Sequence, residues 1–278
     1  MPSCDSASAN AGGLGGGGTF PVAERFVSIN GEGLHAGRFS TFIRFVGCNL
    51  ACSYCDTRWA CDASCPAEDM TSEDILRFVE EAGTPCATLT GGEPCLQPHL
   101  PELVELLVRN TDCFIEIETN GSVDLGSLAE LRRGLEAEAE GFSLGSALVS
   151  GKTLDEVSGE TGDGGLAGTL GCGRIGFTVD CKSPSSGMAS RMLAQNYALL
   201  GADDCVKFVV GSREDMEAAK RVIAENELLE LCPVLFSPVA GNIEPAEIVS
   251  FLQESGLLKA RVQVQLHKII WPKIERGV

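Results

Sequence analysis

Residues 47–57 read Gly47-Cys48-Asn49-Leu50-Ala51-Cys52-Ser53-Tyr54-Cys55-Asp56-Thr57, with three cysteines in a CxxxCxxC pattern. Thiolates are soft ligands that suit iron-sulfur clusters and zinc. A structural zinc ion normally has four protein ligands, so a group of three favours a cubane cluster with one position open for chemistry. Two other interpretations are buried free cysteines and a zinc site completed by Cys61 or Cys65.

The composition is that of an ordinary globular protein. The chain has 278 residues, 44% of them hydrophobic, which suits one large α/β domain or two small ones. Thirteen cysteines, an odd number, without a charged and then apolar leader, favour a reducing compartment, and we expect the cytoplasm. No apolar run approaches the roughly 20 residues that span a bilayer, and the net charge of −18 opposes direct binding of nucleic acid.

The chain divides into a tail, one domain and an interruption. Residues 1–19 are rich in Gly, Ser and Ala, which predicts a flexible tail. Residues 20–278 form the expected domain, and the composition of residues 126–172, acidic and then glycine-rich, predicts an insertion.

Within the domain, strand-like runs alternate with helical patterns, which favours a parallel sheet with crossover helices. The expected strands are 41–46, 86–90, 113–118, 174–180, 204–210, 232–237 and 262–266. The expected helices are 72–82, 98–109, 188–200, 213–227 and 245–255, with Thr71 and Asp74 as a cap for the first.

Polar and glycine motifs fall where these strands end. Each could be a plain turn, but in barrel-type α/β folds the loops at the carboxyl ends of the strands build the active site. We therefore expect one shared face. It would carry the cysteine loop, Thr90-Gly91-Gly92-Glu93-Pro94, Glu118-Thr119-Asn120-Gly121, Asp180-Cys181-Lys182-Ser183-Pro184 and Ser237-Pro238.

The cysteine spacing and the Thr-Gly-Gly-Glu-Pro string resemble the radical S-adenosylmethionine (SAM) superfamily. The resemblance implies an α/β fold, an incomplete TIM-type barrel, here with a Gly-rich insertion. It also implies a [4Fe-4S] cluster held by Cys48, Cys52 and Cys55, with SAM on the fourth iron. The residues implied along SAM are Tyr54, Cys55, Asp56, Gly92, Glu118, Asp180, Cys181, Lys182, Ser183, Ser237, Pro238 and Val239.

Further motifs narrow the resemblance to one family. The segment Ile29-Asn30-Gly31-Glu32-Gly33, Arg44, the ending Cys55-Asp56-Thr57 and the tail from Gln265 to Pro272 are similar to the 7-carboxy-7-deazaguanine synthases of queuosine and 7-deazapurine biosynthesis. The similarity covers residues 22–121 and 174–278.

This family resemblance implies a lyase that contracts the ring of 6-carboxy-5,6,7,8-tetrahydropterin to 7-carboxy-7-deazaguanine with loss of ammonia. The reduced cluster would cleave SAM, and the resulting radical would take a hydrogen from C6 of the pterin. In such enzymes the cofactor supplies the hard step and the protein orients the substrate. A homodimer, and a flavodoxin or ferredoxin as reductant, are also implied.

The same resemblance assigns roles to single residues. Thr57 would reach Mg²⁺, a hard ion that prefers oxygen ligands. The residues that would face the pterin are Ile29, Asn30, Gly31, Arg44 and Thr90. Arg44 suits a carboxylate because a guanidinium offers paired donors to a planar anion.

The chain departs from the family pattern at three places. Asn30 stands where a glutamine is usual, the string from Asp180 to Pro184 replaces a Ser-Pro-Lys, and six residues follow Pro272. Two alternatives therefore stay open. One is a glycyl-radical activating enzyme, which has no clear need for Arg44 or the segment at residues 29–33. The other is a non-catalytic zinc-binding module.

Overall fold

A computed structural model describes residues 18–62, 64–150, 174–274 and 276–278. The predicted tail lies outside the described residues up to residue 17, whereas Thr19 already begins the first strand. Of the predicted insertion, residues 151–172 lie outside the described part as well.

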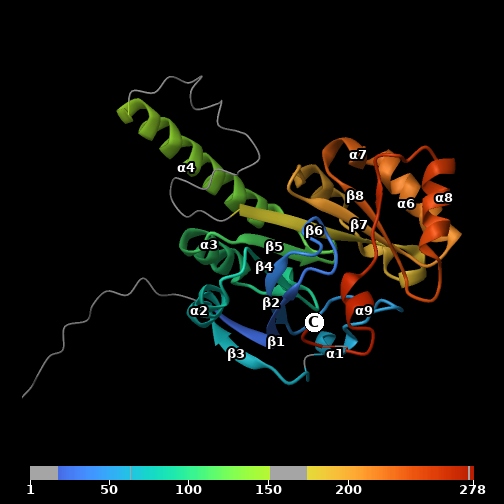
Figure 1. The fold of residues 1–278 in the computed structure, drawn as a ribbon, viewed down its shortest axis with the longest axis horizontal. Coiled ribbons are helices and arrows are strands. Elements are labelled where there is room, and N and C mark those ends of the chain that lie inside the picture. The colour runs from blue at the N-terminus through green and yellow to red at the C-terminus, as the bar shows by residue number, and fades with distance from the viewer. Residues whose placement is uncertain (1–17, 63, 151–173, 275) are drawn as a thin grey trace, which may run out of the picture.

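One nine-stranded sheet runs through the molecule in the order β3-β1-β2-β4-β5-β6-β7-β8-β9 (Figure 1). β1 is antiparallel to both of its neighbours, and the strands from β2 to β9 are parallel. β3 and β9 form the two edges, so the barrel is incomplete, as predicted. The strands are β1 (Thr19–Ile29), β2 (Phe39–Phe45), β3 (Glu68–Thr71), β4 (Cys86–Gly91), β5 (Phe114–Thr119), β6 (Arg174–Lys182), β7 (Cys205–Val210), β8 (Val234–Pro238) and β9 (Arg261–Val262).

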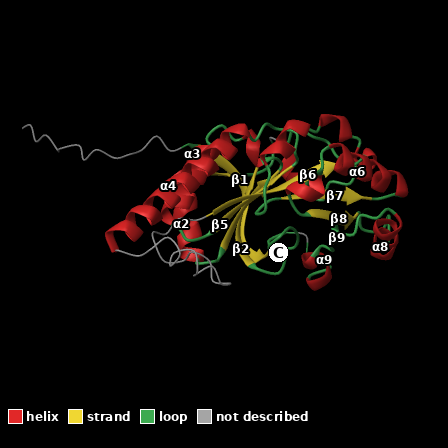
Figure 2. Cartoon of the chain, turned by 90° about the horizontal axis from the view of Figure 1, so that it is seen from above, coloured by secondary structure: helices red, strands yellow, loops and turns green. Residues whose placement is uncertain are grey.

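Crossover helices connect the parallel strands. In Figure 2 the strands fan across the middle of the molecule, with α3 and α6 on one side and α9 on the other. The predicted cap of α2 is present, because Thr71 and Asp74 form a capping box. The α-helices are α1 (Arg58–Cys61), α2 (Ser72–Ala82), α3 (Leu100–Asn110), α4 (Gly126–Ser150), α6 (Arg213–Glu225), α7 (Leu228–Leu231), α8 (Pro245–Glu254) and α9 (Leu266–Ile270).

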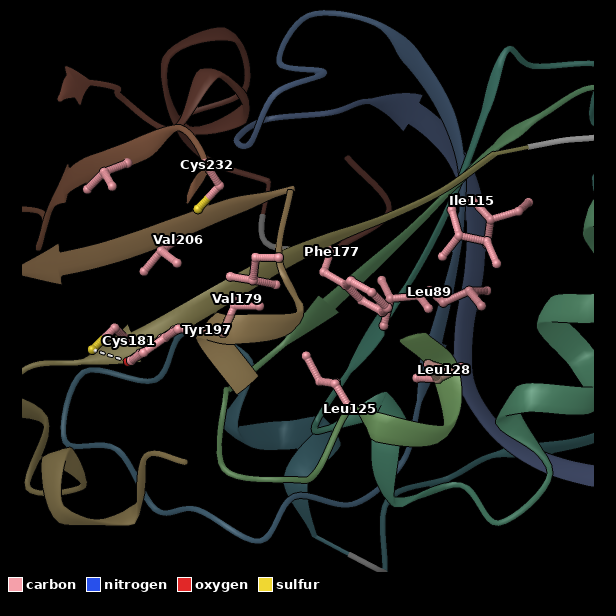
Figure 3. Close-up of a cluster of buried hydrophobic side chains, with 14 of the residues drawn as sticks. Leu89, Ile115, Leu125, Leu128, Phe177, Val179, Cys181, Tyr197, Val206 and Cys232 are labelled. Atoms are coloured by element: carbon pink, nitrogen blue, oxygen red, sulfur yellow. Dashed lines mark hydrogen bonds between the residues drawn. The ribbon is translucent and has the colours of Figure 1, made fainter. Parts of the chain in front are cut away.

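Strand alternation separates two faces of the sheet. The outer face carries apolar side chains that pack against the helices, and Figure 3 shows part of this core, including Leu89, Ile115, Phe177 and Val206. The inner face carries polar side chains instead. They are Ser40, Arg44, Thr88, Thr90, Glu116, Glu118, Thr178, Asp180, Lys182, Lys207 and Ser237.

The predicted helix at 188–200 is wrong. The structure has two 3₁₀ helices there, Ala189–Arg191 and Ala194–Leu199. Asn196 is fully buried and its side chain bonds the backbone at Leu125 and Val123. These long-range bonds fix the segment against the start of α4, so tertiary contacts override the local helical pattern.

The predicted insertion at 126–172 starts too early. Its first part is α4, the helix that leaves β5, and Leu128 and Leu135 lie in the core. Arg132 bonds both carboxylate oxygens of the buried Asp204 at 2.7 and 2.8 Å. The amino-terminal half of α4 is therefore part of the scaffold.

Other boundaries differ at both ends of the sheet. β1 and β3 were not predicted, because β1 contains a proline and β3 is mostly exposed. The expected strand at 262–266 is reduced to the two residues of β9, and Leu266 begins α9. The expected strand at 174–180 continues through Cys181 and Lys182 in β6, and the expected strand at 232–237 corresponds to β8, which ends one residue later at Pro238.

Candidate active site

The cysteine loop, residues 47–57, follows β2 and is held by the loops after three other parallel strands. After β4, the N–H of Glu93 donates to Gly47 O at 2.8 Å. After β5, the Asn120 amide donates to Asn49 Oδ1 at 3.0 Å. After β6, the carbonyl of Ser185 accepts from Ser53 Oγ at 2.7 Å. The structure therefore brings these predicted motifs together at the carboxyl ends of the parallel strands.

The glycine pair after β4 is required for this arrangement. A Cβ on Gly92 would lie 2.0 Å from Gly47 O, and one on Gly91 would lie 2.3 Å from Phe45 O. Gly91 also has φ +142°, a conformation that a side chain disfavours. The backbone of the cysteine loop therefore requires a glycine at position 92, independently of any contact with SAM.

Glu93 ties the loop after β4 to the loop after β5. Its carboxylate is fully buried and accepts from Thr119 Oγ1 at 2.8 Å, Asn120 N at 2.6 Å and Cys95 N at 3.0 Å. Burial raises its pKa, and the hydrogen bonds partly offset that effect. Both oxygens are used inside the protein, so this side chain acts by shaping the site.

Two of the three predicted cluster ligands, Cys48 and Cys55, accept hydrogen bonds that favour their thiolate forms. Hydrogen bonds from Cys61, from Leu50 N–H at 3.4 Å and from the Asn120 amide at 3.6 Å help lower the pKa of Cys48 to about 6. The pKa of Cys55 is also lowered to about 6, chiefly by Cys61, whereas burial raises that of Cys52. Thiolates are the forms that bind metal, so this donor set fits an iron-sulfur cluster.

The two cysteines predicted as a fourth zinc ligand, Cys61 and Cys65, have different surroundings. The Sγ atoms of Cys61 and Cys55 lie 4.0 Å apart, and the Cys65 thiol donates to the carbonyl of Pro66. Within the described residues, no group of three or more His, Cys, Asp or Glu side chains converges as the ligands of one metal ion do. This holds for Cys48, Cys52 and Cys55 as well, so the placement of the thiols does not distinguish a cluster from a zinc site.

The other cysteines serve packing where they are described. Cys86, Cys113, Cys181, Cys205 and Cys232 are buried, as expected for core residues. Cys95 is half-buried, and Cys172 lies outside the described residues.

Most residues predicted along SAM surround the cysteine loop. The carbonyl of Val209 accepts from Tyr54 OH at 3.3 Å and from Ser183 Oγ at 2.8 Å, which joins the cysteine loop to β6 and β7. Asp180 and Lys182 form an ion pair of 2.6 Å on the inner face. Glu118 is half-buried on that face, and burial raises its pKa.

At the end of β8, Ser237 also lies on the inner face, because its hydroxyl donates to Glu32 at 3.0 Å. Pro238 ends that strand, and the N–H of Val239 donates to Val210 O at 2.8 Å. Asp56 of the cysteine loop is exposed, and its carboxylate forms an ion pair with Lys268 of α9 at 3.0 Å.

Cys181 was predicted along SAM, but its side chain lies on the other face of the sheet. It points to the outer face, where it is buried and accepts a hydrogen bond from Tyr197 OH at 3.2 Å, as Figure 3 shows. Asp180 and Lys182 alternate with it along β6, so only they can face the inner side.

Of the residues predicted to face the pterin, Asn30, Arg44 and Thr90 lie on the inner side, whereas the register pairs Ile29 with Phe39 on the other face. Asn30 and Thr90 are buried, and Ile29 ends β1. The Asn30 amide donates to Glu116 at 2.7 Å, so its side chain is bound within the protein. A Cβ on Gly31 would lie 2.3 Å from His267 Nδ1 of α9, and this close packing explains the glycine.

Arg44 is an inner-face cation with capacity left for a ligand. Its Nε bonds Glu24 at 2.7 Å, and both side chains are 17% exposed. Within the described part of the chain, no hydrogen bond engages its two terminal nitrogens. These are the atoms that would grip a carboxylate.

The prediction from sequence missed a buried charge cluster. Lys207 contacts Glu32 at 2.8 Å and Asp180 at 3.1 Å. Glu116 accepts from Thr178 and Asn30 at 2.7 Å each, and its pKa is raised to about 7, chiefly by burial and then by Glu118. One sequence signal was available, namely a lysine in the middle of the apolar run at residues 205–210.

We expect Gly92→Ala to lose most of its iron, because the new Cβ would collide with the backbone of the cysteine loop. Gly134→Ala is the matched control, since its Cβ meets no atom within 4 Å, and it should load like the wild type. Iron and sulfide analysis after anaerobic reconstitution gives the measurement. Normal loading of Gly92→Ala would contradict the packing role.

Comparison with known proteins agrees with this geometry. Residues 42–144 match the family model of the radical SAM superfamily. The 7-carboxy-7-deazaguanine synthase of Clostridium acetobutylicum is 38% identical over 93% of this chain and 99% of that protein. The synthase of the same name from Chlorobaculum tepidum is 30% identical over 92% of this chain and 96% of that protein.

A solved structure shares the fold. The crystal structure of QueE from Escherichia coli superposes with a TM-score of 0.56 at 19% identity, covering 89% of this chain and 94% of that chain. Together with the relatives above, this likeness confirms the incomplete TIM-type barrel. The chain belongs to the 7-carboxy-7-deazaguanine synthase family of radical SAM enzymes.

Proposed function

We propose that this enzyme converts 6-carboxy-5,6,7,8-tetrahydropterin to 7-carboxy-7-deazaguanine with release of ammonia, as a carbon-nitrogen lyase of queuosine or 7-deazapurine biosynthesis. The name of the relatives supports this activity. The observation that carries it is the position of α9, which bridges the two predicted subsites. His267 packs against Gly31 of the pterin segment, and Lys268 bonds Asp56 of the cysteine loop.

The cofactors of this proposal are a [4Fe-4S] cluster and SAM, and the family supports both. When bound, they supply the one-electron chemistry that starts the rearrangement. Cys48, Cys52 and Cys55 would hold the cluster. Along SAM we place Tyr54, Cys55, Asp56, Gly92, Glu118, Asp180, Lys182, Ser183, Ser237, Pro238 and Val239.

The chain's own residues would orient the pterin. Arg44 would bind its carboxylate through the two terminal nitrogens, while Glu24 fixes the guanidinium through Nε. The backbone at Ile29 and Gly31 and the hydroxyl of Thr90 would line the ring. The Asn30 side chain would act indirectly, by positioning Glu116, because its amide already donates to that carboxylate.

The decisive experiment is incubation of the reduced, reconstituted enzyme with SAM and the carboxytetrahydropterin. We expect 7-carboxy-7-deazaguanine and ammonia. Cleavage of SAM without a deazaguanine product would instead indicate another radical SAM activity, such as activation of a glycyl-radical enzyme. Colourless protein that carries only zinc after full reconstitution would favour a non-catalytic module.

We expect Arg44→Ala to weaken pterin binding by about 2 kcal/mol, the scale of a charge-assisted hydrogen bond, with little effect on SAM. Anaerobic titration calorimetry with each ligand separates the two. Arg25→Ala is the control, because Arg25 lies on the opposite face of the β1–β2 pair and bonds Glu68 near the surface. Equal losses of pterin and SAM affinity would contradict the role of Arg44.

We also propose that the enzyme binds Mg²⁺, to which Thr57 would supply an oxygen ligand. Its hydroxyl lies 3.1 Å from Asp56 Oδ1, so a second hard oxygen is close. We expect Thr57→Ala to lower the stimulation of turnover by added Mg²⁺, while Thr57→Ser retains it. An unchanged metal response in Thr57→Ala would remove Thr57 from the site.

The cellular setting is proposed by the same family analogy. We propose a homodimer in the cytoplasm, reduced by a flavodoxin or ferredoxin. Among the described helices, none combines the length and apolar character required to cross a bilayer.

A further inference from the structure

Lys207 is a buried cation in the middle of a parallel sheet. It lies in β7 between β6 and β8 and is 6% exposed. Its neighbours on the same face of the strand, Cys205 and Val209, carry no charge. Burying an ammonium is costly unless it is paired, so its partners are informative.

The partners of Lys207 come from two different subsites. Its Nζ donates to Glu32 Oε2 at 2.8 Å, and Glu32 belongs to the 29–33 segment placed beside the pterin. The same atom lies 3.1 Å from Asp180 Oδ1, which belongs to the residues placed along SAM. Although burial opposes it, these two carboxylates raise the pKa of Lys207 well above its usual range.

The two carboxylates do not depend on Lys207 equally. Asp180 keeps a second cation, because Lys182 bonds its other oxygen at 2.6 Å. Within the described residues, the hydrogen bond that Glu32 keeps comes from a neutral donor, the hydroxyl of Ser237 at 3.0 Å. Loss of Lys207 would therefore leave Glu32 as the less compensated carboxylate.

Glu32 also lacks support from regular structure. It follows the end of β1 and lies between two residues with ties of their own: Gly31 accepts from Leu266 N, and Gly33 donates to Gln263 Oε1. Both of those ties lead to the carboxyl-terminal segment. At the start of the turn Asn30 bonds Glu116 and Thr88 of the sheet, and the ion pair with Lys207 adds a link to the sheet at Glu32.

We propose that Lys207 is a positioning residue, which holds Glu32 and with it the turn at residues 30–33 on the inner face where the pterin binds. The inference deepens the proposed function and rests on it for the identity of the ligand. An apolar side chain would serve packing equally well, as Cys205 and Val209 do. The lysine adds a fixed charge between the two subsites.

The test compares Lys207→Met with Lys207→Arg in the reconstituted holoenzyme. We expect Lys207→Met to raise the pterin Kd about tenfold or more, as loss of one partner of a buried charge pair does. The SAM Kd should change much less, because Lys182 still neutralises Asp180. Lys207→Arg should recover most of the pterin affinity, since the cation is retained.

The matched control is Lys259→Met. It removes the same charge from an ion pair of similar length with Glu230, but at the surface, where Lys259 is 64% exposed. Both Kd values should stay at wild-type levels. Equal losses for pterin and SAM in Lys207→Met, or no rescue by Lys207→Arg, would overturn the positioning role.

A second readout does not depend on the ligand. Hydrogen exchange of the backbone amides at residues 30–33 should speed up in Lys207→Met. It should also speed up in Glu32→Gln, which breaks the same pair from the loop side and leaves the sheet intact. Unchanged exchange in both variants would refute the inference. If the wild type does not bind the pterin, the proposed function fails, and the exchange data still decide whether Lys207 holds the turn.

Discussion

The site depends on one close contact, between the backbone of Gly92 and the backbone of Gly47. Because Gly92 has no side chain, the end of β4 can lie directly against the start of the cysteine loop, whereas Gly47 is favoured by its φ of +97°. Glu93 follows at once and clamps the next loop through Thr119 and Asn120. The Asn120 amide in turn reaches Cys48 and Asn49. One short string of residues therefore sets the position of the thiols relative to two strands.

Alternation along the strands decides which side chains face the core and which face the site. On β6, Phe177, Val179 and Cys181 pack outward, while Asp180 and Lys182 face inward. The parallel strands also carry most of their buried charges on the inner side, so a single sheet supplies an apolar core on one face and a charged site on the other. It also explains why a motif read as a continuous string, such as Asp180-Cys181-Lys182, contributes its residues to two different environments.

The sequence was sufficient for features that depend on local order. The cysteine spacing, the glycine pair and the helix expected at 98–109 concern residues close in the chain, and each is found where it was expected. Features that depend on distant contacts were missed. The helix expected at 188–200 is replaced because Asn196 bonds the backbone before α4, and β3 forms because β1 offers it an edge.

The buried charges show most clearly why distance in the chain limits prediction. Lys207 and Glu32 are 175 residues apart, and only the order of the strands brings them together. Taken alone, a lysine within an apolar strand conflicts with its surroundings, and a glutamate in a glycine-rich turn is unremarkable. The conflict is resolved by the pairing of the two, since each neutralises a charge that would be costly alone. A strand residue that breaks the local pattern therefore indicates that a partner of opposite charge lies across the fold, and here that partner lies beside the proposed substrate.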